Sequence, residues 1–345
     1  MEFRFKNRSA GVLFTALCAV VLFSLFSCNL NFDFLGDFWR PSDTFHAGDY
    51  AALTKRTGVD FRILQFTDTH INAYYDGFAI EESFNMMRKA VQITGPDLIV
   101  LTGDNVGNFI NSVWAWQLIT FLDSLRVPYA LVMGNHDGDF TIFNDDNQQH
   151  IVAEIFSKGK HSLFSMGPDN LSGTGNYGIN IVDESGDIIH GLILMDSGDD
   201  YLRNDQIEWY DWYVRGLEAS AGGLVQTSVF IHVPPCEVSL IKEEMKAYGL
   251  TDLDGRSADD AFREGPMVQD ANTGLFSRVK ALGSTTHIFF GHDHKNILNY
   301  QYQGVSFVYG LKTGYCAYYD KDRVGAVLVT LDDTGSITGV SFHHL

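Results

Sequence analysis

Five short clusters of reactive side chains stand out in this chain of 345 residues. They read Thr-Asp-Thr-His at 67–70, Gly-Asp-Asn at 103–105, Gly-Asn-His-Asp at 134–137, His232, and Gly-His-Asp-His at 291–294. Together they offer carboxylate, imidazole and amide oxygen groups and no thiolate, a donor set that suits hard to borderline divalent metal ions. A single Asp-x-His or Gly-Asp is an ordinary turn sequence, so the argument rests on the whole series.

Each cluster follows or closes a short apolar run of the kind that forms a strand. The runs are 61–66, 97–102, 129–133, 228–233 and 286–291. In open α/β sheets, ligands bind at the carboxyl edge of the strands, so we expect the clusters to line one shared cleft. We also expect Gly103, Gly134 and Gly291 to let the backbone turn sharply, so that the next side chain enters the cleft.

Seven of these side chains are candidate metal ligands, which is more than one ion with an open position can use. They suit two ions about 3.5–4 Å apart that share one carboxylate, the geometry used for phosphoester displacement. The candidates are Asp68, His70, Asp104, Asn135, His232, His292 and His294. His136 is a candidate proton donor, because a histidine titrates near neutral pH and can protonate a leaving oxygen.

The segments around the clusters predict an α/β architecture. Apolar runs alternate with stretches of helical spacing at 80–94, 112–125 and 204–220. The apolar strands show little alternation, which indicates a sheet buried on both faces. Further strands are predicted at 177–182, 188–197 and 305–310, with a terminal hairpin over 326–344. Residues 140–176 and 234–275 predict long irregular connections, which in compact domains are usually functional or disordered.

The ordered clusters resemble the calcineurin-like metallophosphoesterase family, with its D-x-H, G-D, G-N-H-[D/E], H and G-H-x-H blocks. The resemblance implies a four-layer αββα sandwich of two mixed β-sheets flanked by helices, and two divalent ions (Mn, Fe, Zn or Ni) as cofactors. It implies one ion on Asp68, His70 and His294, and a second on Asn135, His232 and His292, with Asp104 as the bridge. His136 then protonates the alkoxide that leaves after attack by a metal-bound hydroxide.

Longer strings are similar to the purple-acid-phosphatase-like branch, which includes fungal cell-cycle phosphatases and plant counterparts. They are ILQFTDTHIN, GNHDGD, IHVPPCEV, GHDHKN and GLKTGYCAYY. Two departures narrow the resemblance. The purple tyrosine ligand would stand three residues after Asp104, where this chain has Gly107, so a purple iron site is not expected. The run GDNVGNF also lacks the arginine of protein Ser/Thr phosphatases, which argues against that activity.

Five further side chains are weaker candidates for roles beside the metals, and Asn105 is one of them. Asp137 and Asp293 either orient neighbouring histidines through hydrogen bonds or face solvent. Lys312 and Tyr315 either contact substrate phosphate or lie on a hairpin surface. The other histidines are expected at the surface or in local hydrogen bonds: His46, His150, His161, His190, His287, His343 and His344.

The amino-terminal residues predict export and lipid attachment. Three basic residues precede an uninterrupted apolar run, and LFSCN resembles a bacterial lipobox with Cys28 as the lipidated residue. A plain secretory signal and an uncleaved anchor are the alternatives. The lipoprotein interpretation assigns 1–27 to a signal peptide, 28–58 to a tether and 59–345 to a metallophosphoesterase catalytic domain. It predicts a protein anchored to a membrane of the bacterial cell envelope.

Composition limits the remaining choices. The formal net charge is −19 and 45% of the residues are apolar, so the chain can bury a large core. Nucleic-acid binding is not expected, because it requires clustered Lys and Arg. Cys236 and Cys316 follow no CxxC spacing, which excludes a cysteine zinc site. They either form a disulfide or pack as small apolar residues, and we favour the second interpretation.

These observations together predict hydrolysis of a phosphoester substrate by a dinuclear metal centre. Phosphomonoesters are favoured, with phosphodiesters as the alternative, because the same metals serve both. A lipid or glycan-phosphate hydrolase is a further alternative, given the tether and the aromatic segment Trp209–Tyr213. A non-catalytic envelope binding protein that retains the fold is another, although such a protein gains nothing from His136.

Overall fold

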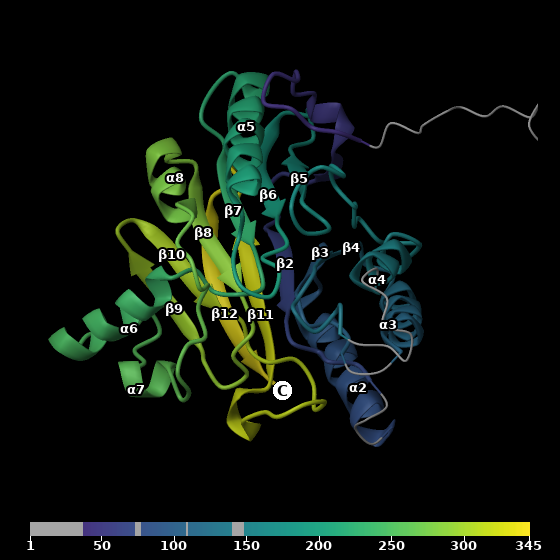
Figure 1. Cartoon of the computed structure of the whole chain (residues 1–345), viewed down its shortest axis with the longest axis vertical. Helices are drawn as coiled ribbons and strands as arrows, with labels where there is room; N and C mark the ends of the chain where they lie inside the picture. Colours follow the sequence, from purple (N-terminus) through teal and green to yellow (C-terminus); the bar gives the residue numbers. More distant parts are fainter. Residues whose placement is uncertain (1–36, 73–76, 108–109, 140–147) are drawn as a thin grey trace, which may run out of the picture. The chain divides into compact units, whose positions relative to one another are not determined.

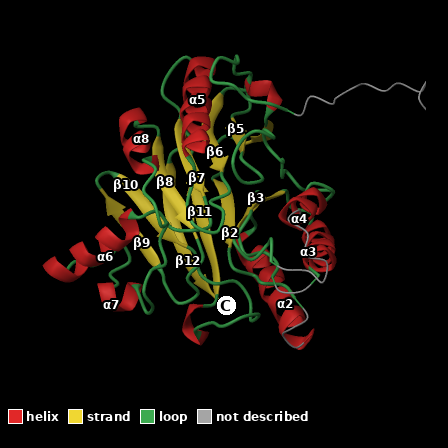
Figure 2. Cartoon of the chain, in the orientation of Figure 1, coloured by secondary structure: helices red, strands yellow, loops and turns green. Residues whose placement is uncertain are grey.

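The computed structural model describes residues 37–72, 77–107, 110–139 and 148–345. One compact unit extends from Trp39 to Leu345. Within this unit, two β-sheets pack against each other and helices cover their outer faces (Figure 2). The predicted four-layer αββα arrangement is therefore confirmed.

The smaller sheet has five strands in the order β12-β11-β2-β3-β4. The strands are β2 (Phe61–Phe66), β3 (Leu98–Thr102), β4 (Tyr129–Val132), β11 (Gly325–Leu331) and β12 (Ile337–His344). β2, β3 and β4 run parallel, whereas β11 is antiparallel to both of its neighbours. Every residue of β3 and β4 is buried, because helices and the second sheet cover the two faces.

The larger sheet has seven strands in the order β1-β5-β6-β7-β8-β10-β9. The strands are β1 (Ala51–Thr54), β5 (Tyr177–Val182), β6 (Ile188–Leu194), β7 (Gln226–Phe230), β8 (Thr285–Phe290), β9 (Leu298–Tyr302) and β10 (Val305–Tyr309). β6, β7, β8 and β10 run parallel, so their carboxyl ends point the same way. The pairs β5–β6 and β9–β10 are antiparallel, whereas the edge strand β1 runs parallel to β5, so the sheet is mixed.

Helices form the two outer layers (Figure 1). The five-stranded side carries α2 (Gly77–Thr94), α3 (Asn111–Leu125) and α4 (Gln148–Phe156), and α2 packs on β2 and β11. The seven-stranded side carries α5 (Asn204–Ala221), α6 (Glu237–Tyr248) and α8 (Leu275–Leu282), and α5 packs on β6. Shorter helices are η1 (Ala47–Asp49), α7 (Ala258–Ala261) and η2 (Lys321–Arg323).

Two apolar cores hold these layers together. One fills the space between the sheets and extends under α2 and α3. The other lies between the seven-stranded sheet and its helices, and it includes Trp209, Tyr210 and Tyr213 of α5. Most of the aromatic segment on α5 is therefore structural, which removes one of the two observations behind a lipid or glycan-phosphate substrate and leaves the predicted tether.

Some elements differ from the sequence-based expectation. α4 and α6 lie in ranges expected to be irregular, although Val238, Ile241 and Met245 of α6 have helical spacing and Gly249 ends the helix with φ 62°. β1 lies in the segment assigned to a tether, because it completes the edge of the larger sheet beside β5. Such a short edge strand takes its partner from the tertiary structure, so its local sequence gives little signal.

Within the described ranges, no helix is long and apolar enough to cross a membrane. The proposed signal peptide and Cys28 lie outside the described residues.

Candidate metal centre

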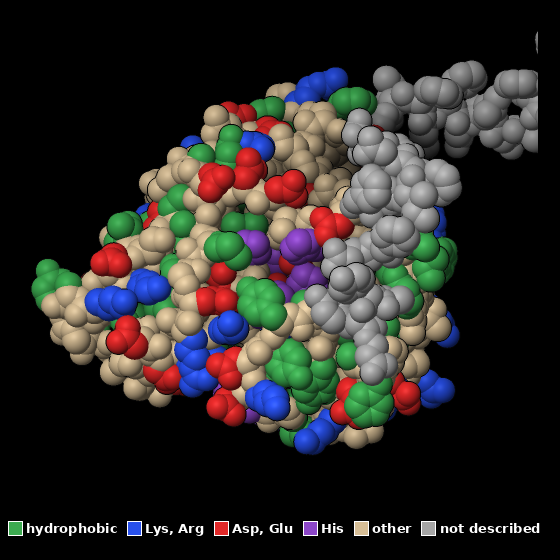
Figure 3. Space-filling model, turned by 60° about the horizontal axis from the view of Figure 1, so that its bottom comes forward, with side chains coloured by type: hydrophobic (Ala, Val, Ile, Leu, Met, Phe, Trp, Pro, Cys, Tyr) green, Lys and Arg blue, Asp and Glu red, His purple; other side chains and the backbone are tan. Residues whose placement is uncertain are grey.

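The five clusters meet at one edge of the sandwich, where β2, β3, β4, β7 and β8 end. Backbone hydrogen bonds join two of the loops. Asp68 N–H donates to Gly103 O (3.0 Å) and His70 N–H donates to Asp104 O (2.8 Å). On the face drawn in Figure 3, histidine side chains gather at one place with acidic side chains beside them. The shared cleft expected from the sequence is present.

Four candidate ligands have a left-handed backbone, which is unusual for residues other than glycine. The φ angles are 54° at Asp68, 45° at His70, 49° at Asp104 and 82° at His292. Such conformations are unfavourable and persist only where the surroundings enforce them, which is common at functional sites. Here they turn the chain at the strand ends, so that the following groups face the cleft.

The three glycines beside the ligands serve two different purposes. Gly103 has φ +87°, so it turns the chain as the sequence predicts. Gly134 and Gly291 do not have a positive φ. A Cβ at Gly134 would lie 2.0 Å from Asp104 N, and one at Gly291 would lie 1.8 Å from Thr67 Oγ1. These two positions require glycine because neighbouring loops approach closely, which corrects the explanation based on turns.

One group of donors consists of Asp68, His70 and His294. Their ligand atoms all lie within 4.8 Å of one another. Nε2 of His70 is 3.1 Å from Nε2 of His294, and the latter is 3.6 Å from Asp68 Oδ1. Imidazole and carboxylate groups that converge in this way match the donors that a divalent ion binds.

A second group consists of Asp104, His232 and His292, whose ligand atoms also lie within 4.8 Å of one another. Asn135 joins it, with Oδ1 3.1 Å from His232 Nε2. Asp104 Oδ2 lies 3.3 Å from His232 Nε2 and 3.3 Å from His70 Nε2 of the first group. The structure thus brings the seven candidates together in the grouping that the resemblance implies, with Asp104 between the groups.

Backbone carbonyls fix the orientation of two of these histidines. His232 Nδ1 lies 2.8 Å from Thr102 O, and His294 Nδ1 lies 2.6 Å from Tyr318 O. A carbonyl only accepts, so Nδ1 carries a proton in both rings and Nε2 is the nitrogen that faces the cleft. In the described part of the chain, buried Nδ1 of His292 has no hydrogen-bond partner. This donor set fits two cations.

The protonation of the buried histidines also matters for metal binding. Burial lowers the pKa of His70 to about 3 and that of His292 to about 4, and it moves the pKa of His294 below its usual range. These imidazoles are therefore neutral, as a ligand must be. Burial also disfavours a charge on His232, but Asp104 outweighs this effect and raises the pKa of His232 to about 10. A cation that binds His232 must displace its proton.

His136 lies at the mouth of the cleft, with 43% of its side chain exposed. Its backbone N–H donates to Asp104 Oδ1 (2.8 Å), which fixes it beside the two donor groups. Its Nδ1 lies 2.5 Å from Asp139 Oδ2, and this hydrogen bond raises the pKa of His136 to about 9. Sequence reasoning missed Asp139, although it stands three residues after His136 in the GNHDGD string.

Asp137 is buried and holds the loops after β3 and β4 together. Its carboxylate accepts hydrogen bonds from Gly134 N, Val106 N and Asn105 Nδ2, each at 2.8 Å. Of the two alternatives for Asp137, solvent exposure does not hold. It orients the turn that carries His136, and Asn105 serves as one of its hydrogen-bond partners.

The remaining weak candidates lie around the first donor group. Asp293 is buried and accepts from Tyr309 Oη and Met267 N, so it anchors a neighbouring loop. Lys312 is buried too, and its ammonium donates to the carbonyl oxygen of Asp68. Tyr315 is half-buried, and its backbone N–H donates to Ser83 Oγ of α2 (2.8 Å).

Gly107 lies beside the candidate metal centre, at the position where a purple acid phosphatase has its tyrosine ligand. A Cβ at Gly107 would lie 3.1 Å from His70 Nδ1 and 3.5 Å from His136 Cβ. A tyrosine at this position would therefore reach the centre, and this chain has no side chain there.

Other histidines and the cysteines behave as ordinary residues. His190 is buried, with its ring nitrogens 2.7 Å from Gly335 O and 2.9 Å from Ser228 Oγ. His150 is exposed on α4, 3.6 Å from Glu154. Cys236 and Cys316 are both free thiols. The favoured interpretation of the two cysteines agrees with this arrangement.

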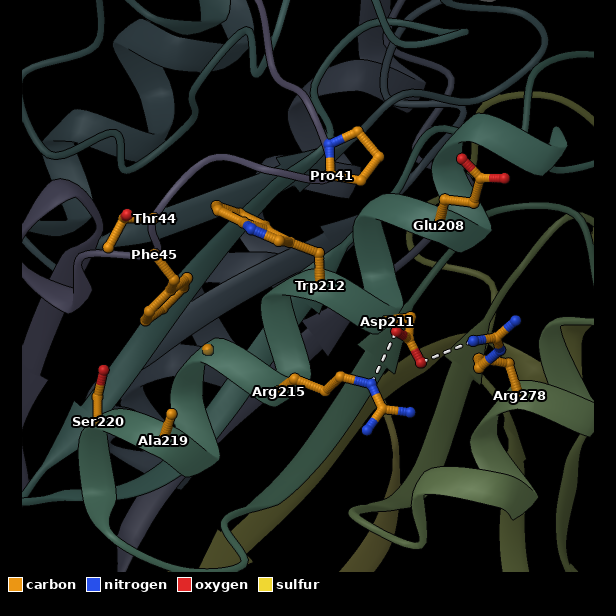
Figure 4. A pocket seen from close by; sticks show the side chains of 11 residues that line it. Pro41, Thr44, Phe45, Glu208, Asp211, Trp212, Arg215, Ala219, Ser220 and Arg278 are labelled. Atoms are coloured by element: carbon orange, nitrogen blue, oxygen red, sulfur yellow. Dashed lines mark hydrogen bonds and ion pairs between the residues drawn. The ribbon is translucent and has the colours of Figure 1, made fainter.

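A cavity of about 750 Å³ lies elsewhere, between the segment 41–45 and α5 (Figure 4). Trp212 and Phe45 supply its apolar wall. Arg215 and Arg278 both bind Asp211, at 2.9 and 2.8 Å, so their charges are already paired. None of the seven candidate ligands lines this cavity.

Comparison with known proteins places this geometry in a family. The model of the family called calcineurin-like phosphoesterase matches residues 61–296. "Probable inactive purple acid phosphatase 29" from Arabidopsis thaliana is 25% identical over 306 residues, covering 75% of this chain and 73% of that protein. "Phosphatase DCR2" from Saccharomyces cerevisiae is 23% identical over 300 residues, covering 77% of this chain and 48% of that protein.

A dimetal phosphatase from Danio rerio is a solved structure similar to this one, with 11% identity and a TM-score of 0.47 over 79% of this chain and 93% of that one. The relatives include purple-acid-phosphatase-like proteins and a yeast phosphatase, as the sequence motifs predict. The family match spans well over half of the chain. The chain therefore belongs to the calcineurin-like phosphoesterase family.

Proposed function

We propose that this chain is a dinuclear metal-dependent phosphohydrolase that acts on phosphomonoesters. The observation that carries the proposal is the pair of donor groups joined by Asp104, with His136 at the mouth of the same cleft. Family membership supports phosphoester hydrolysis in general. The name of the yeast relative, a phosphatase, favours monoesters over diesters.

The donor set supports a site for each of two divalent ions. Asp68, His70 and His294 would hold one, and His232, His292 and Asn135 would hold the other, with Asp104 between them. When bound, such a pair supplies Lewis acidity toward the phosphoryl oxygens and makes water acidic enough to serve as a nucleophile. Asp, His and Asn ligands accept Mn, Fe, Zn or Ni.

The chain's own groups then handle the leaving oxygen. A bond from a water oxygen to phosphorus forms in line with the phosphorus–oxygen bond that breaks. His136 donates its Nε2 proton to the departing oxygen, so that a neutral alcohol leaves. Asp139 holds Nδ1 of the same ring and favours the protonated form that this step requires.

The test uses the full chain, purified in detergent, stripped of metal and then supplied with Mn, Zn or Fe. An aryl phosphomonoester and an aryl phosphodiester are assayed in parallel. We expect metal-dependent hydrolysis of the monoester that His136→Ala abolishes. Faster turnover of the diester would replace the monoesterase proposal with its alternative. The absence of bound metal would overturn both.

A non-catalytic binding role is the second candidate, because the Arabidopsis relatives carry the name of probable inactive purple acid phosphatases. Against it, this chain keeps the seven donors together and adds a histidine held by a carboxylate, which a binder does not need. Two bound ions per chain without hydrolysis of either ester would favour this second role.

We also propose that the protein is a lipid-anchored component of the bacterial cell envelope. The support is the basic and apolar leader followed by LFSCN, with Cys28 as the attachment residue. Membrane and soluble fractions of cells that express the wild type and Cys28→Ala provide the test. The proposal predicts that the wild type is found in the membrane fraction and is labelled by fatty acid, and that Cys28→Ala loses both properties. Equal fatty-acid labelling of the two proteins would contradict the proposal.

A further inference from the structure

A single loop supports the first donor group. The 311–319 loop follows β10 and leads toward η2. Within the described structure, its hydrogen bonds and ring contacts to candidate ligands reach Asp68 and His294. Both belong to the group that also contains His70.

Lys312 is the part of this loop that reaches Asp68. The side chain is buried, with 1% exposed, and its ammonium donates to the carbonyl oxygens of Asp68 and Thr313. Lysine is rarely buried, because its charge then needs partners inside the protein. Asp68 has the left-handed φ of 54°, which a residue with a Cβ adopts only when its surroundings hold it. The ammonium fixes the carbonyl of this strained residue.

The loop is itself strapped to the end of β2. Thr313 N–H donates to Thr67 O (2.9 Å), and Thr67 N–H donates to Thr313 Oγ1 (3.2 Å). Thr67 Oγ1 in turn donates to Asp68 Oδ2 (2.7 Å). Both the backbone and the carboxylate of Asp68 are therefore positioned by groups that depend on this strap.

Tyr318 reaches the second ligand of the same group. Its carbonyl lies 2.6 Å from His294 Nδ1, and its ring stacks on the His294 ring with centroids 4.1 Å apart. The carbonyl selects the tautomer, and the phenol ring limits rotation of the imidazole. The Tyr318 side chain is itself 47% exposed, so its removal leaves the core intact.

Two members of the other donor group, His232 and Asp104, have contacts with different elements. His232 Nδ1 is fixed by Thr102 O at the end of β3, and Asp104 Oδ1 accepts from His136 N in the loop after β4. The two groups share Asp104, and the N–H of His292 also donates to the Asp68 carboxylate (3.1 Å). The contacts of the 311–319 loop with described candidate ligands nevertheless reach only the first group.

We propose that the 311–319 loop is the positioning element of one cation site only. Through Lys312 and Tyr318 it sets the affinity of the site formed by Asp68, His70 and His294, and it affects the His232 and His292 site far less. This inference rests on the proposed dinuclear centre. In this inference Lys312 positions the metal ligand Asp68 and does not contact the phosphate of the substrate.

The experiment measures Mn²⁺ binding to the full chain in detergent by titration calorimetry, together with the electron paramagnetic resonance spectrum of the bound ions. We expect two ions and a spin-coupled spectrum in the wild type. In Lys312→Met we expect one site to weaken by roughly 10- to 100-fold, the effect typical of residues that orient ligands. The other site changes less than about twofold, and the spectrum becomes that of isolated Mn²⁺. The matched control is Lys321→Met, an exposed lysine beyond the loop, which retains both ions.

Tyr318→Ala tests the same site if Lys312→Met does not fold, because it removes the ring that stacks on His294 and keeps the backbone carbonyl. Tyr318→Phe, which keeps the ring as well, serves as its control. Selective loss of one ion in Tyr318→Ala supports the inference. Two unchanged affinities in both variants, or equal weakening of both sites, would overturn it. A wild type that binds no Mn²⁺ would instead refute the dinuclear centre, so the two failures are distinguishable.

Discussion

The hydrogen bond between His136 and Asp139 makes a specific prediction about the pH dependence of turnover. His136 acts in its protonated form, and Asp139 raises its pKa from 6.5 to about 9. A raised pKa means that the active form is present at low pH and is lost as the pH rises through that value. Asp139→Asn removes this support, so the alkaline limb of kcat/KM moves to lower pH by roughly 2.5 units.

The shift translates into a ratio that a pH–rate profile measures directly. At pH 8, a pKa near 9 leaves about nine-tenths of His136 protonated, and a pKa near 6.5 leaves about one thirtieth, so activity falls by roughly 30-fold. At pH 6 the loss is under about twofold. Asp199→Asn is the matched control, because Asp199 interacts with His136 through charge alone. A loss of equal size at pH 6 and pH 8 would refute the reasoning.

Three further predictions concern the site and the fold. His136→Ala keeps its metal and loses turnover by roughly 10²- to 10⁴-fold, whereas Asp104→Asn loses metal as well, as metal analysis beside the assay will show. Tyr177→Phe leaves the N–H and C=O of Leu131 unpaired in β4 and costs about 2–4 kcal/mol in denaturant unfolding; a cost below about 1 kcal/mol would contradict this. Burial lowers the pKa of His190 to about 4, so the folded state binds a proton on this residue less readily than the unfolded state does. The contribution of His190 to the free energy of unfolding is therefore complete above pH 6.5 and falls by about 2 kcal/mol at pH 5. The free energy of unfolding of His190→Gln, measured with denaturant between pH 6.5 and pH 5, should not show this decrease.

The sequence was informative wherever a ligand type coincided with the end of a strand. Buried parallel strands carry long apolar runs, and their carboxyl ends must meet at one edge, so Asp68, Asp104 and Asn135 could be placed in one cleft without coordinates. The structure brings them together as expected. The alternation of apolar runs and helical spacing predicted an α/β architecture, and the four layers were expected from the family resemblance.

The supporting residues could not be predicted in this way, because their roles depend on which groups meet across loops. Lysine is normally a surface residue, and nothing in GLKTGY indicates that the Lys312 ammonium lies under Asp68. Asp139 contacts His136 because of the turn that joins them, which Asp137 fixes from beneath. Gly291 illustrates the same limit, because glycine is required there by the close approach of Thr67, which follows β2 in the sequence.

The most direct test of the central claim counts bound ions and measures hydrolysis in one sample. The full chain is stripped of metal, reloaded with Mn²⁺, and assayed with an aryl phosphomonoester as the ions are titrated in. The account predicts that hydrolysis rises with occupancy and reaches its plateau at two ions per chain. A plateau at one ion, or hydrolysis that persists without any metal, would contradict it.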